Sequence, residues 1–196
     1  MESPKEPELA SERKYLSTGE KISFGLGSLP YVVAYFAIMN LAYPVLNMKL
    51  GMSATLIGLA LSVGRLWDAV SDPLIGWWSD NTRGRWGRRK PFILSGAIGV
   101  AIALPLMWVM PLEAGDTYRF VWFTFISLVF YTAGTFFCVT WLSMSYEMTP
   151  NPQERTSIHG WRAFFSACAG FAMPWMFRGA QMEVFDNILQ GAFWLS

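Results

Sequence analysis

Residues 64–92 read GRLWDAVSDPLIGWWSDNTRGRWGRRKPF, and this stretch decides how the chain is organised. Its first half is apolar except for Arg65, Asp68 and Asp72, and its second half is a short loop rich in arginine. Spacings of three and four residues place the three charged side chains on one face of a helix. If that helix crosses a membrane, each charge at mid-depth costs about 2.5–3.5 kcal/mol on insertion scales. This face is therefore predicted to meet a protein partner or a watery cavity rather than lipid.

The composition of the whole chain is also that of a membrane protein. Of the 196 residues, 53% are hydrophobic and only 15% are charged, whereas soluble domains carry about 25% charged residues. A helix needs about 20 apolar residues to cross the hydrocarbon core of a bilayer. Stretches of this kind lie at residues 22–47, 53–79, 91–111, 120–146 and 158–177, and a sixth begins near residue 184.

These stretches predict an all-α membrane protein with five complete transmembrane helices and the start of a sixth. In lipid, backbone groups must find partners within a helix or a closed barrel, and the sequence lacks the alternating pattern of barrel strands. Residues 1–21 are charged in both signs and predict a solvated tail, while residues 22–196 predict part of a helical bundle. Because the last apolar run stops at Ser196, we expect a fragment or a truncated gene product.

The arginines and lysines between the apolar stretches predict the orientation of the bundle. Eleven lie in the N-terminal tail, in the loop after residue 79 and in the region 147–162. Only Lys49, Arg119 and Arg178 lie in the loops of the opposite side. Because cytoplasmic loops of membrane proteins carry an excess of positive charge, the N-terminus is predicted to be cytoplasmic.

Other features of the sequence argue against several classes of function. The net charge of +1 gives no support for a nucleic-acid partner. Cys138 and Cys168 fall within apolar stretches, so we expect them to pack as small side chains. His159 has no second histidine or cysteine nearby that would form a zinc site. No Ser/His/Asp set or nucleotide-binding loop is present, so we expect neither an enzyme nor a bound organic cofactor.

The three charges of the second apolar stretch suit an ion-coupling site. Asp68 and Asp72 are one helical turn apart and repel each other unless a cation, a proton or Arg65 compensates. Pro73 directly follows Asp72 and weakens the helix there. The alternative is that Arg65 and Asp68 form a buried ion pair that only holds helices together, which leaves Asp72 unexplained.

Three segments of the chain carry a resemblance to a known family. Residues 67–92 hold an Asp-x-x-x-Asp-Pro pair, a Gly-x-x-x-Asp turn and the sequence Arg-x-Trp-Gly-Arg-Arg-Lys-Pro. In this they resemble the glycoside–pentoside–hexuronide:cation symporters, the melibiose-permease-like family of the major facilitator superfamily. Residues 140–162, TWLSMSYEMTPNPQERTSIHGWR, are similar to a second family segment, and residues 24–31, FGLGSLPY, are a weaker match.

This resemblance implies a cation site on two helices. The family's pair of cation-binding aspartates matches Asp68 and Asp72, and a threonine of its fourth helix matches Thr135. Ser71 stands where the family has an asparagine, and its hydroxyl is still an oxygen ligand. Oxygen ligands suit a hard cation such as Na⁺, so the implied coupling ion is Na⁺ or H⁺, with Asp68 and Asp72 as the metal ligands if it is Na⁺.

The sugar site of the family is less well matched. Val32 and Cys138 stand where the family has sugar-binding aspartates, which removes the strong acceptors for sugar hydroxyls. We therefore expect poor transport of melibiose-like galactosides. The candidate substrate contacts are Tyr31, Tyr35, Cys138, Trp141 and Arg162; the alternatives for these side chains are helix packing and, for Arg162, a topology charge.

A third set of residues is implied to act in gating. Asp80, Arg88 and Arg89 belong to the loop signature of the superfamily, which is implied to lock one state through contacts with the other half. Arg65 joins this candidate gating set from within the membrane. The alternative for the loop is that its charges only determine topology.

The resemblance implies a cation-coupled secondary symporter of sugars or glycosides that works by alternating access. Such transporters bind their solute near the midplane, between two halves of the molecule. The implied partners are a small-molecule solute, the lipid bilayer and the C-terminal half of the transporter, and the implied location is a bacterial inner membrane. Two alternatives stay open: a major facilitator transporter of a lipid-like or other non-sugar solute, and a non-transporting membrane scaffold.

Overall fold

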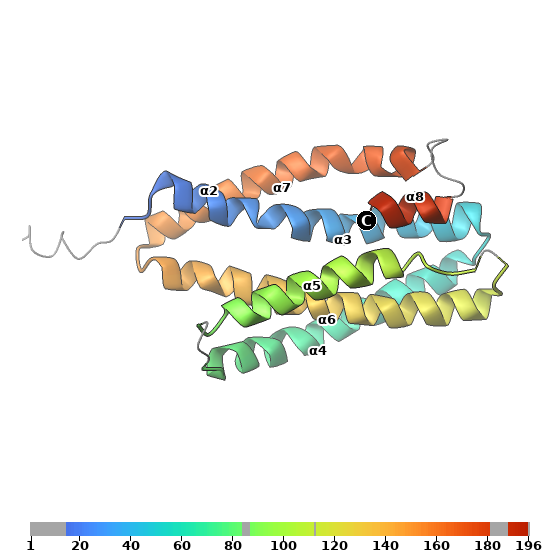
Figure 1. Ribbon diagram of the computed structural model, residues 1–196, viewed down its shortest axis with the longest axis horizontal. Helices are drawn as coiled ribbons and strands as arrows, with labels where there is room; N and C mark the ends of the chain where they lie inside the picture. The colour runs from blue at the N-terminus through green and yellow to red at the C-terminus, as the bar shows by residue number, and fades with distance from the viewer. Residues whose placement is uncertain (1–14, 84–86, 112, 181–187, 196) are drawn as a thin grey trace, which may run out of the picture.

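The computed structural model describes residues 15–83, 87–111, 113–180 and 188–195 of the chain (Figure 1). Every regular element in those ranges is a helix, which confirms the all-α fold class. The elements are α2 (Thr18–Leu26), α3 (Ser28–Ala42), the π-helix η1 (Tyr43–Lys49), α4 (Ala54–Asn81), α5 (Lys90–Leu106), α6 (Asp116–Met148), α7 (Pro152–Ala180) and α8 (Ile188–Leu195).

The helices lie close to the apolar stretches of the sequence, with one clear difference. α2, α3 and η1 follow one another and together cover the first stretch, residues 22–47. α5 ends at Leu106 and does not continue to residue 111. Pro105 lies just before this end and interrupts the helical hydrogen-bonding pattern. The last turn is narrower than an α-helical turn, because the N–H of Trp108 donates to the carbonyl of Pro105, three residues earlier, at 3.1 Å. The expected helix start near residue 184, the tail up to residue 14 and Arg85 lie outside the described residues.

Two helical stretches of the described chain are long and apolar enough to cross a membrane. They are Thr18–Lys49, with 32 residues, and Asp116–Met148, with 33 residues. Lys90–Leu106 is apolar but shorter. α4 is long enough but carries Arg65, Asp68 and Asp72 in its middle, which lowers its hydropathy. The count of five membrane spans therefore stays a prediction.

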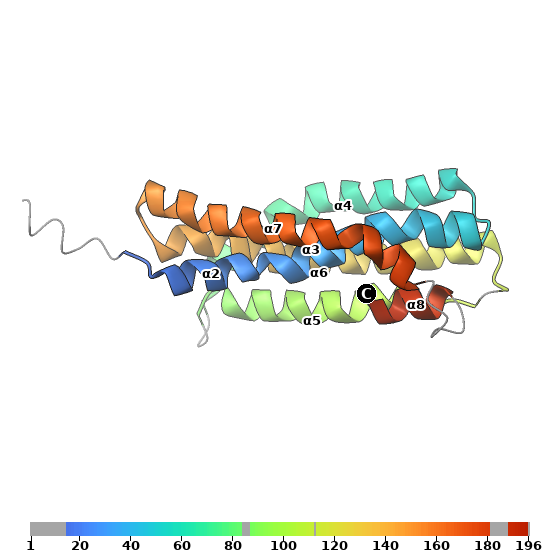
Figure 2. The ribbon, with the colours of Figure 1, turned by 90° about the horizontal axis from the view of Figure 1, so that it is seen from above.

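The long helices form two groups that lie side by side along the bundle (Figure 1). In the α4–α6 group, α4 and α5 both pack on α6 and lie on opposite sides of it (Figure 2). In the α3–α7 group, α2 and α3 pack on α7. The start of α2, the end of α4, the start of α5 and the junction of α6 with α7 share one end of the bundle (Figure 1). This end carries most of the described loop arginines and lysines, which is the side that the sequence predicts to be cytoplasmic.

Small residues bring the helices of the α4–α6 group close together. α4 buries one face against α6, and that face includes Ala60, Gly64 and Ser71. On α5, a Cβ added at Gly96 would lie 2.8 Å from the carbonyl oxygen of Ala133 in α6. Because these positions carry little or no side chain, α6 is held between α4 and α5 and its polar residues come within reach of both.

Two apolar clusters join the two groups at either end of the bundle. The first, which we call the α8-end cluster, includes Ile38, Leu46, Met107, Phe123 and Leu189 and draws on α3, η1, α4, α5, α6 and α8. The second, the α2-end cluster, consists of Leu16, Phe24, Trp141 and Ile158, with partly buried neighbours from α5 and α6. Between the two clusters the groups separate, and a cavity remains.

Candidate functional site

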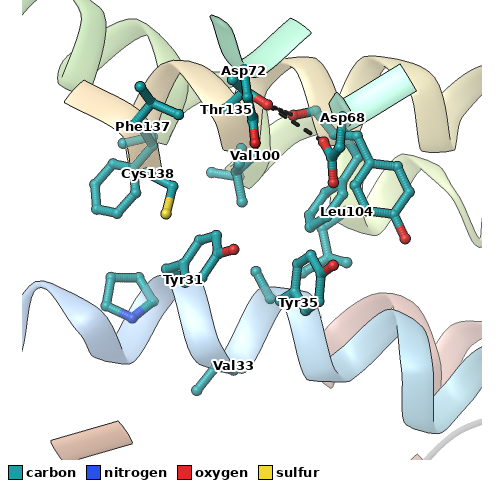
Figure 3. A pocket seen from close by; sticks show the side chains of 18 of the residues that line it. Tyr31, Val33, Tyr35, Asp68, Asp72, Val100, Leu104, Thr135, Phe137 and Cys138 are labelled. Carbon is teal, nitrogen blue, oxygen red and sulfur yellow. Dashed lines mark hydrogen bonds between the residues drawn. The ribbon is translucent and has the colours of Figure 1, made fainter. Parts of the chain in front are cut away.

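A cavity of about 500 Å³ lies between α3 and the α4–α6 group (Figure 3). Its lining comprises Pro30, Tyr31, Val33, Ala34 and Tyr35 of α3, Arg65, Asp68 and Asp72 of α4, Ala97, Val100, Ala101 and Leu104 of α5, and Phe130, Tyr131, Gly134, Thr135, Phe137, Cys138, Val139 and Leu142 of α6. The charged groups come from α4, whereas α5 contributes only aliphatic side chains. The cavity therefore has a charged edge and an apolar wall.

Four oxygen-bearing side chains gather where α4 crosses α6. Thr135 Oγ1 lies 3.4 Å from Asp68 Oδ1 and also 3.4 Å from Ser71 Oγ. Asp72 lies one turn further along α4 and lines the same cavity (Figure 3). The structure thus brings together all four residues that the family resemblance places in a cation site. They come from two helices whose crossing is fixed by the small residues of the α4 face.

The hydroxyl of Thr135 is suited to act as an acceptor. A hydroxyl has one proton and two lone pairs. Thr135 Oγ1 donates to the carbonyl oxygen of Tyr131 at 3.1 Å, which is shorter than its distance to Asp68. Its single proton can serve either the Tyr131 carbonyl or Asp68 Oδ1; while it serves the carbonyl, a lone pair is free to bind a cation placed beside Asp68. Carboxylate and hydroxyl oxygens are the ligands that a hard cation prefers.

The described residues hold no group of three or more His, Cys, Asp or Glu side chains arranged to bind a metal ion. The candidate site has only two carboxylates, Asp68 and Asp72, and its other ligands are hydroxyls. Because Arg65 beside Asp68 offsets one of the two negative charges, a divalent ion would leave the site with a net positive charge. The site is better matched to a monovalent ion.

Three of the five predicted substrate contacts line the cavity. Tyr31 and Tyr35 project from α3 towards the α4–α6 group, and Cys138 faces them from α6 (Figure 3). The rings of Tyr31 and Tyr35 stack with their centroids 5.6 Å apart. Val32, which the sequence count places at a sugar-binding position, is buried and does not belong to the lining.

The other two predicted contacts lie outside the lining of this cavity. Trp141 is only 5% exposed and stacks on Phe24 of α2 at 4.7 Å. Its ring also stacks on Phe137 with the centroids 5.9 Å apart, so it packs within the α2-end cluster, while Leu142 lines the cavity. Arg162 lies in α7, and its backbone carbonyl accepts a hydrogen bond from the hydroxyl of Ser28 at 3.3 Å.

The predicted gating residues separate into two places. Arg65 lies at the cavity, 3.7 Å from Asp68, whereas Asp80, Arg88 and Arg89 meet at the end of the bundle. There Arg89 pairs with Asp80 at 2.9 Å and with Glu147 at 2.7 Å, and Arg88 also pairs with Glu147. The sequence prediction missed Glu147, although this residue lies within residues 140–162, the second segment that carries the family resemblance.

Glu147 ties the end of α6 to the loop between α4 and α5. Burial acts to raise the pKa of Glu147, but the hydrogen bonds and positive charges of Arg89 and Arg88 outweigh it and hold the pKa below its ordinary value of 4.5. A carboxyl whose pKa is lowered by folding stabilises the fold while it is charged, and this contribution is lost as the pH falls through its folded pKa.

Glu147→Gln is therefore expected to lower the thermal unfolding midpoint of the full-length protein at pH 7. The shift should be only a few degrees, because the Glu147 side chain is 40% exposed and solvent screens the ion pairs. The difference in unfolding midpoint between wild type and variant should shrink and disappear as the pH falls below the ordinary carboxyl pKa of 4.5. Scanning fluorimetry across the pH range checks this. Glu113→Gln is the control, since Glu113 is exposed and forms no ion pair with the described residues. If Glu147→Gln lowered the unfolding midpoint by the same amount at every pH, the prediction would be wrong.

Comparison with known proteins identifies the family. The family described as MFS/sugar transport protein matches residues 23–181, which is most of the chain. The chain belongs to this family. Its membership confirms the resemblance that residues 67–92 and 140–162 carry to melibiose-permease-like symporters. It also places the chain in an integral membrane protein, and in a family of transporters rather than of enzymes.

Several curated relatives of this MFS/sugar transport chain are named as symporters. The uncharacterised symporter sll1374 of Synechocystis is 33% identical over 164 residues, which are 81% of this chain and 30% of that protein. YagG of Escherichia coli K12, a candidate glycoside/cation symporter, is 33% identical over 81% of this chain and 34% of its own length. The sodium-dependent lysophosphatidylcholine symporter 1-A of Danio rerio is 28% identical over 80% of this chain and 29% of its own length. The chain spans about a third of the length of these relatives.

Proposed function

We propose that the protein to which this chain belongs is a cation-coupled secondary symporter, and that Asp68, Asp72, Thr135 and Ser71 bind the coupling cation. The observation that carries the proposal is the meeting of these oxygens at the charged edge of the cavity, with Thr135 3.4 Å from both Asp68 and Ser71. A site at the edge of a solute cavity can couple the two ligands, because the charge at that edge changes when the cation arrives.

The charges around the cavity favour one monovalent cation. Asp68 and Asp72 carry two negative charges when ionised, and Arg65 supplies one positive charge. Uncompensated charge is costly in surroundings of low dielectric constant, so one further positive charge balances the site. A proton needs only one carboxylate, whereas Na⁺ uses several oxygens. The two hydroxyls of Thr135 and Ser71 therefore support Na⁺ over H⁺.

A sugar or glycoside is the first candidate for the solute. Tyr31 and Tyr35 present stacked rings and hydroxyls to the cavity, and such side chains bind sugar rings by stacking and hydrogen bonding. The similarity to YagG supports the same class. A lipid-like solute is the second candidate. It is favoured by the aliphatic wall of α5, by Cys138 in place of a carboxylate and by the similarity to a lysophosphatidylcholine symporter.

The test is uptake by the full-length protein in proteoliposomes with an imposed sodium gradient or a proton gradient. Labelled glycosides and labelled lysophospholipids are supplied separately, and potassium replaces sodium in the control. We expect accumulation of one class of solute, driven by sodium, with melibiose a poor substrate. Accumulation that no cation gradient stimulates would contradict the coupling. The class of solute that accumulates decides between the two candidates.

The remaining features of the proposed symporter follow from this reading. We propose that the N-terminus is cytoplasmic, that a C-terminal half completes the transport pathway, and that the protein lies in a bacterial inner membrane. Reporter fusions after Arg89 and after Asp116 check the orientation, since these positions lie at opposite ends of the bundle (Figure 1).

A further inference from the structure

We propose that the rings of Tyr35 and Tyr131, which meet edge to face, together hold the guanidinium of Arg65 on one side, and that this aromatic clamp sets the affinity of the neighbouring carboxylates for the coupling cation. The inference rests on the proposed function and goes beyond it. It makes Tyr35 and Tyr131 positioning residues, which act on the cation through Arg65 rather than by touching it.

The geometry of Arg65 is unusual for an arginine beside a carboxylate. Its Nη1 lies 3.7 Å from Asp68 Oδ2, whereas a charge-assisted hydrogen bond between such groups is about 2.7–2.9 Å long. Its guanidinium carbon instead lies 4.5 Å from the centroid of the Tyr35 ring and 6.0 Å from that of the Tyr131 ring. Arg65 is thus held mainly by aromatic faces, and it stands back from a carboxylate that it is close enough to neutralise.

The sequence of α4 explains why the Tyr131 ring can lie beside Arg65. Gly64 directly precedes Arg65, and a Cβ added at Gly64 would overlap Cδ2 and Cε2 of the Tyr131 ring. Only glycine lets this ring lie against the α4 backbone. Tyr131 is 2% exposed, so the surrounding packing fixes it. Tyr35 meets it edge to face at 6.1 Å and is supported from the other side by Tyr31.

Arg65 and the coupling cation compete for the same charge. Asp68 has one oxygen facing Thr135 and the other facing Arg65. If the guanidinium advanced by about an ångström, it would hydrogen-bond to Asp68 and reduce the pull of that carboxylate on a cation. The clamp prevents this advance, because moving forward would remove Arg65 from the Tyr35 ring. Cation affinity is therefore higher with the clamp than without it.

The clamp also connects three helices. Tyr35 belongs to α3, Arg65 to α4 and Tyr131 to α6, and α3 lies across the cavity from the other two (Figure 3). A movement of α3 relative to α4 changes the distance between Tyr35 and Arg65. The affinity of Asp68 and Asp72 for the cation is in this way linked to the width of the cavity. Ordered binding of cation and solute requires such a link between their two sites.

The experiment titrates the full-length protein in nanodiscs with Na⁺ and follows intrinsic tryptophan fluorescence and binding heat. Tyr35→Leu is expected to raise the half-saturating Na⁺ concentration by about two- to fivefold, the size of a lost cation–π contact at a guanidinium that is half exposed. Tyr35→Phe keeps the ring and should restore the wild-type midpoint. Phe36→Leu is the matched control: it removes a ring from the neighbouring position of α3, which is exposed and outside the cavity lining, and it should leave the Na⁺ midpoint unchanged.

A double variant separates the clamp from simple packing. In an Arg65→Gln background there is no guanidinium to release, so adding Tyr35→Leu should leave the Na⁺ midpoint unchanged. If Tyr35→Leu raised the half-saturating Na⁺ concentration equally in both backgrounds, the inference would be overturned. It would also be overturned if Tyr35→Leu left the Na⁺ midpoint of the otherwise wild-type protein unchanged. A wild-type protein with no Na⁺ midpoint at all would overturn the proposed function together with the inference. Size-exclusion profiles show that each variant is folded, and Tyr35 is chosen because it is only partly buried, unlike Tyr131.

Discussion

Asp72→Asn in the full-length protein is expected to abolish accumulation of solute against its gradient, and Asp68→Asn should do the same. Each change removes one of the two carboxylates at the charged edge of the cavity and keeps the size and shape of the side chain. With Arg65 beside a single remaining carboxylate, the site is already neutral and has little attraction for a further cation. A lost cation site means lost coupling, because a ligand drives a conformational change only through its differential affinity for the two states.

The expected readout is specific to coupling. The ratio of solute inside to solute outside should fall to unity under an imposed sodium gradient. Exchange of labelled for unlabelled solute should survive, since exchange needs the cavity but no net movement of the cation. Asp116→Asn is the matched control, because it makes the same substitution at the start of α6, outside the cavity. If both cavity variants concentrate solute as wild type does, the carboxylates are structural.

Gly96→Ala is expected to have the largest effect on folding. An added Cβ would overlap the backbone nitrogen of Phe137 and would lie 2.8 Å from the carbonyl oxygen of Ala133 and 2.9 Å from the carbonyl carbon of Phe136. These are backbone atoms of α6, so the contact is relieved only if the two helices move apart. Overpacking costs about 1–3 kcal/mol when side chains can adjust, and a backbone clash belongs at or above the upper end of that range.

The result should be visible in the amount and stability of folded protein. Gly96→Ala is expected to reduce the monodisperse fraction on size exclusion and to lower the thermal midpoint strongly. Gly58→Ala is the control in α4, because a Cβ added there meets nothing within 4 Å; it should be neutral or slightly stabilising, since glycine within a helix costs about 0.5–1 kcal/mol relative to alanine. Equal stability of the two variants would show that α5 and α6 do not approach as closely as described.

The candidate cation site could be predicted from the sequence because most of it is local. Asp68, Ser71 and Asp72 lie within five residues of one helix, and helical periodicity alone places them together. Thr135 required the family resemblance, because nothing in the sequence of α6 by itself says which of its residues crosses α4. The structure adds the physical reason: the small residues Gly64 and Ser71 let α6 approach at that level.

The features that sequence reasoning missed depend on contacts between distant segments. Tyr131 is adjacent to Arg65 only because Gly64 leaves room for its ring. Trp141 was expected at the substrate, but its ring stacks on Phe24 of α2 instead. Glu147 pairs with arginines nearly 60 positions earlier, and the hydropathy of a single helix contains no information about such a pairing.

The two apolar clusters differ in size, and this difference indicates which end of the bundle separates more easily. Among the described residues, the α8-end cluster has 21 buried members, whereas the α2-end cluster has four. The cost of parting two surfaces rises with the apolar area that they bury. We therefore expect the helices described here to separate first at the α2 end, where the stacked rings of Phe24 and Trp141 join α2 to α6.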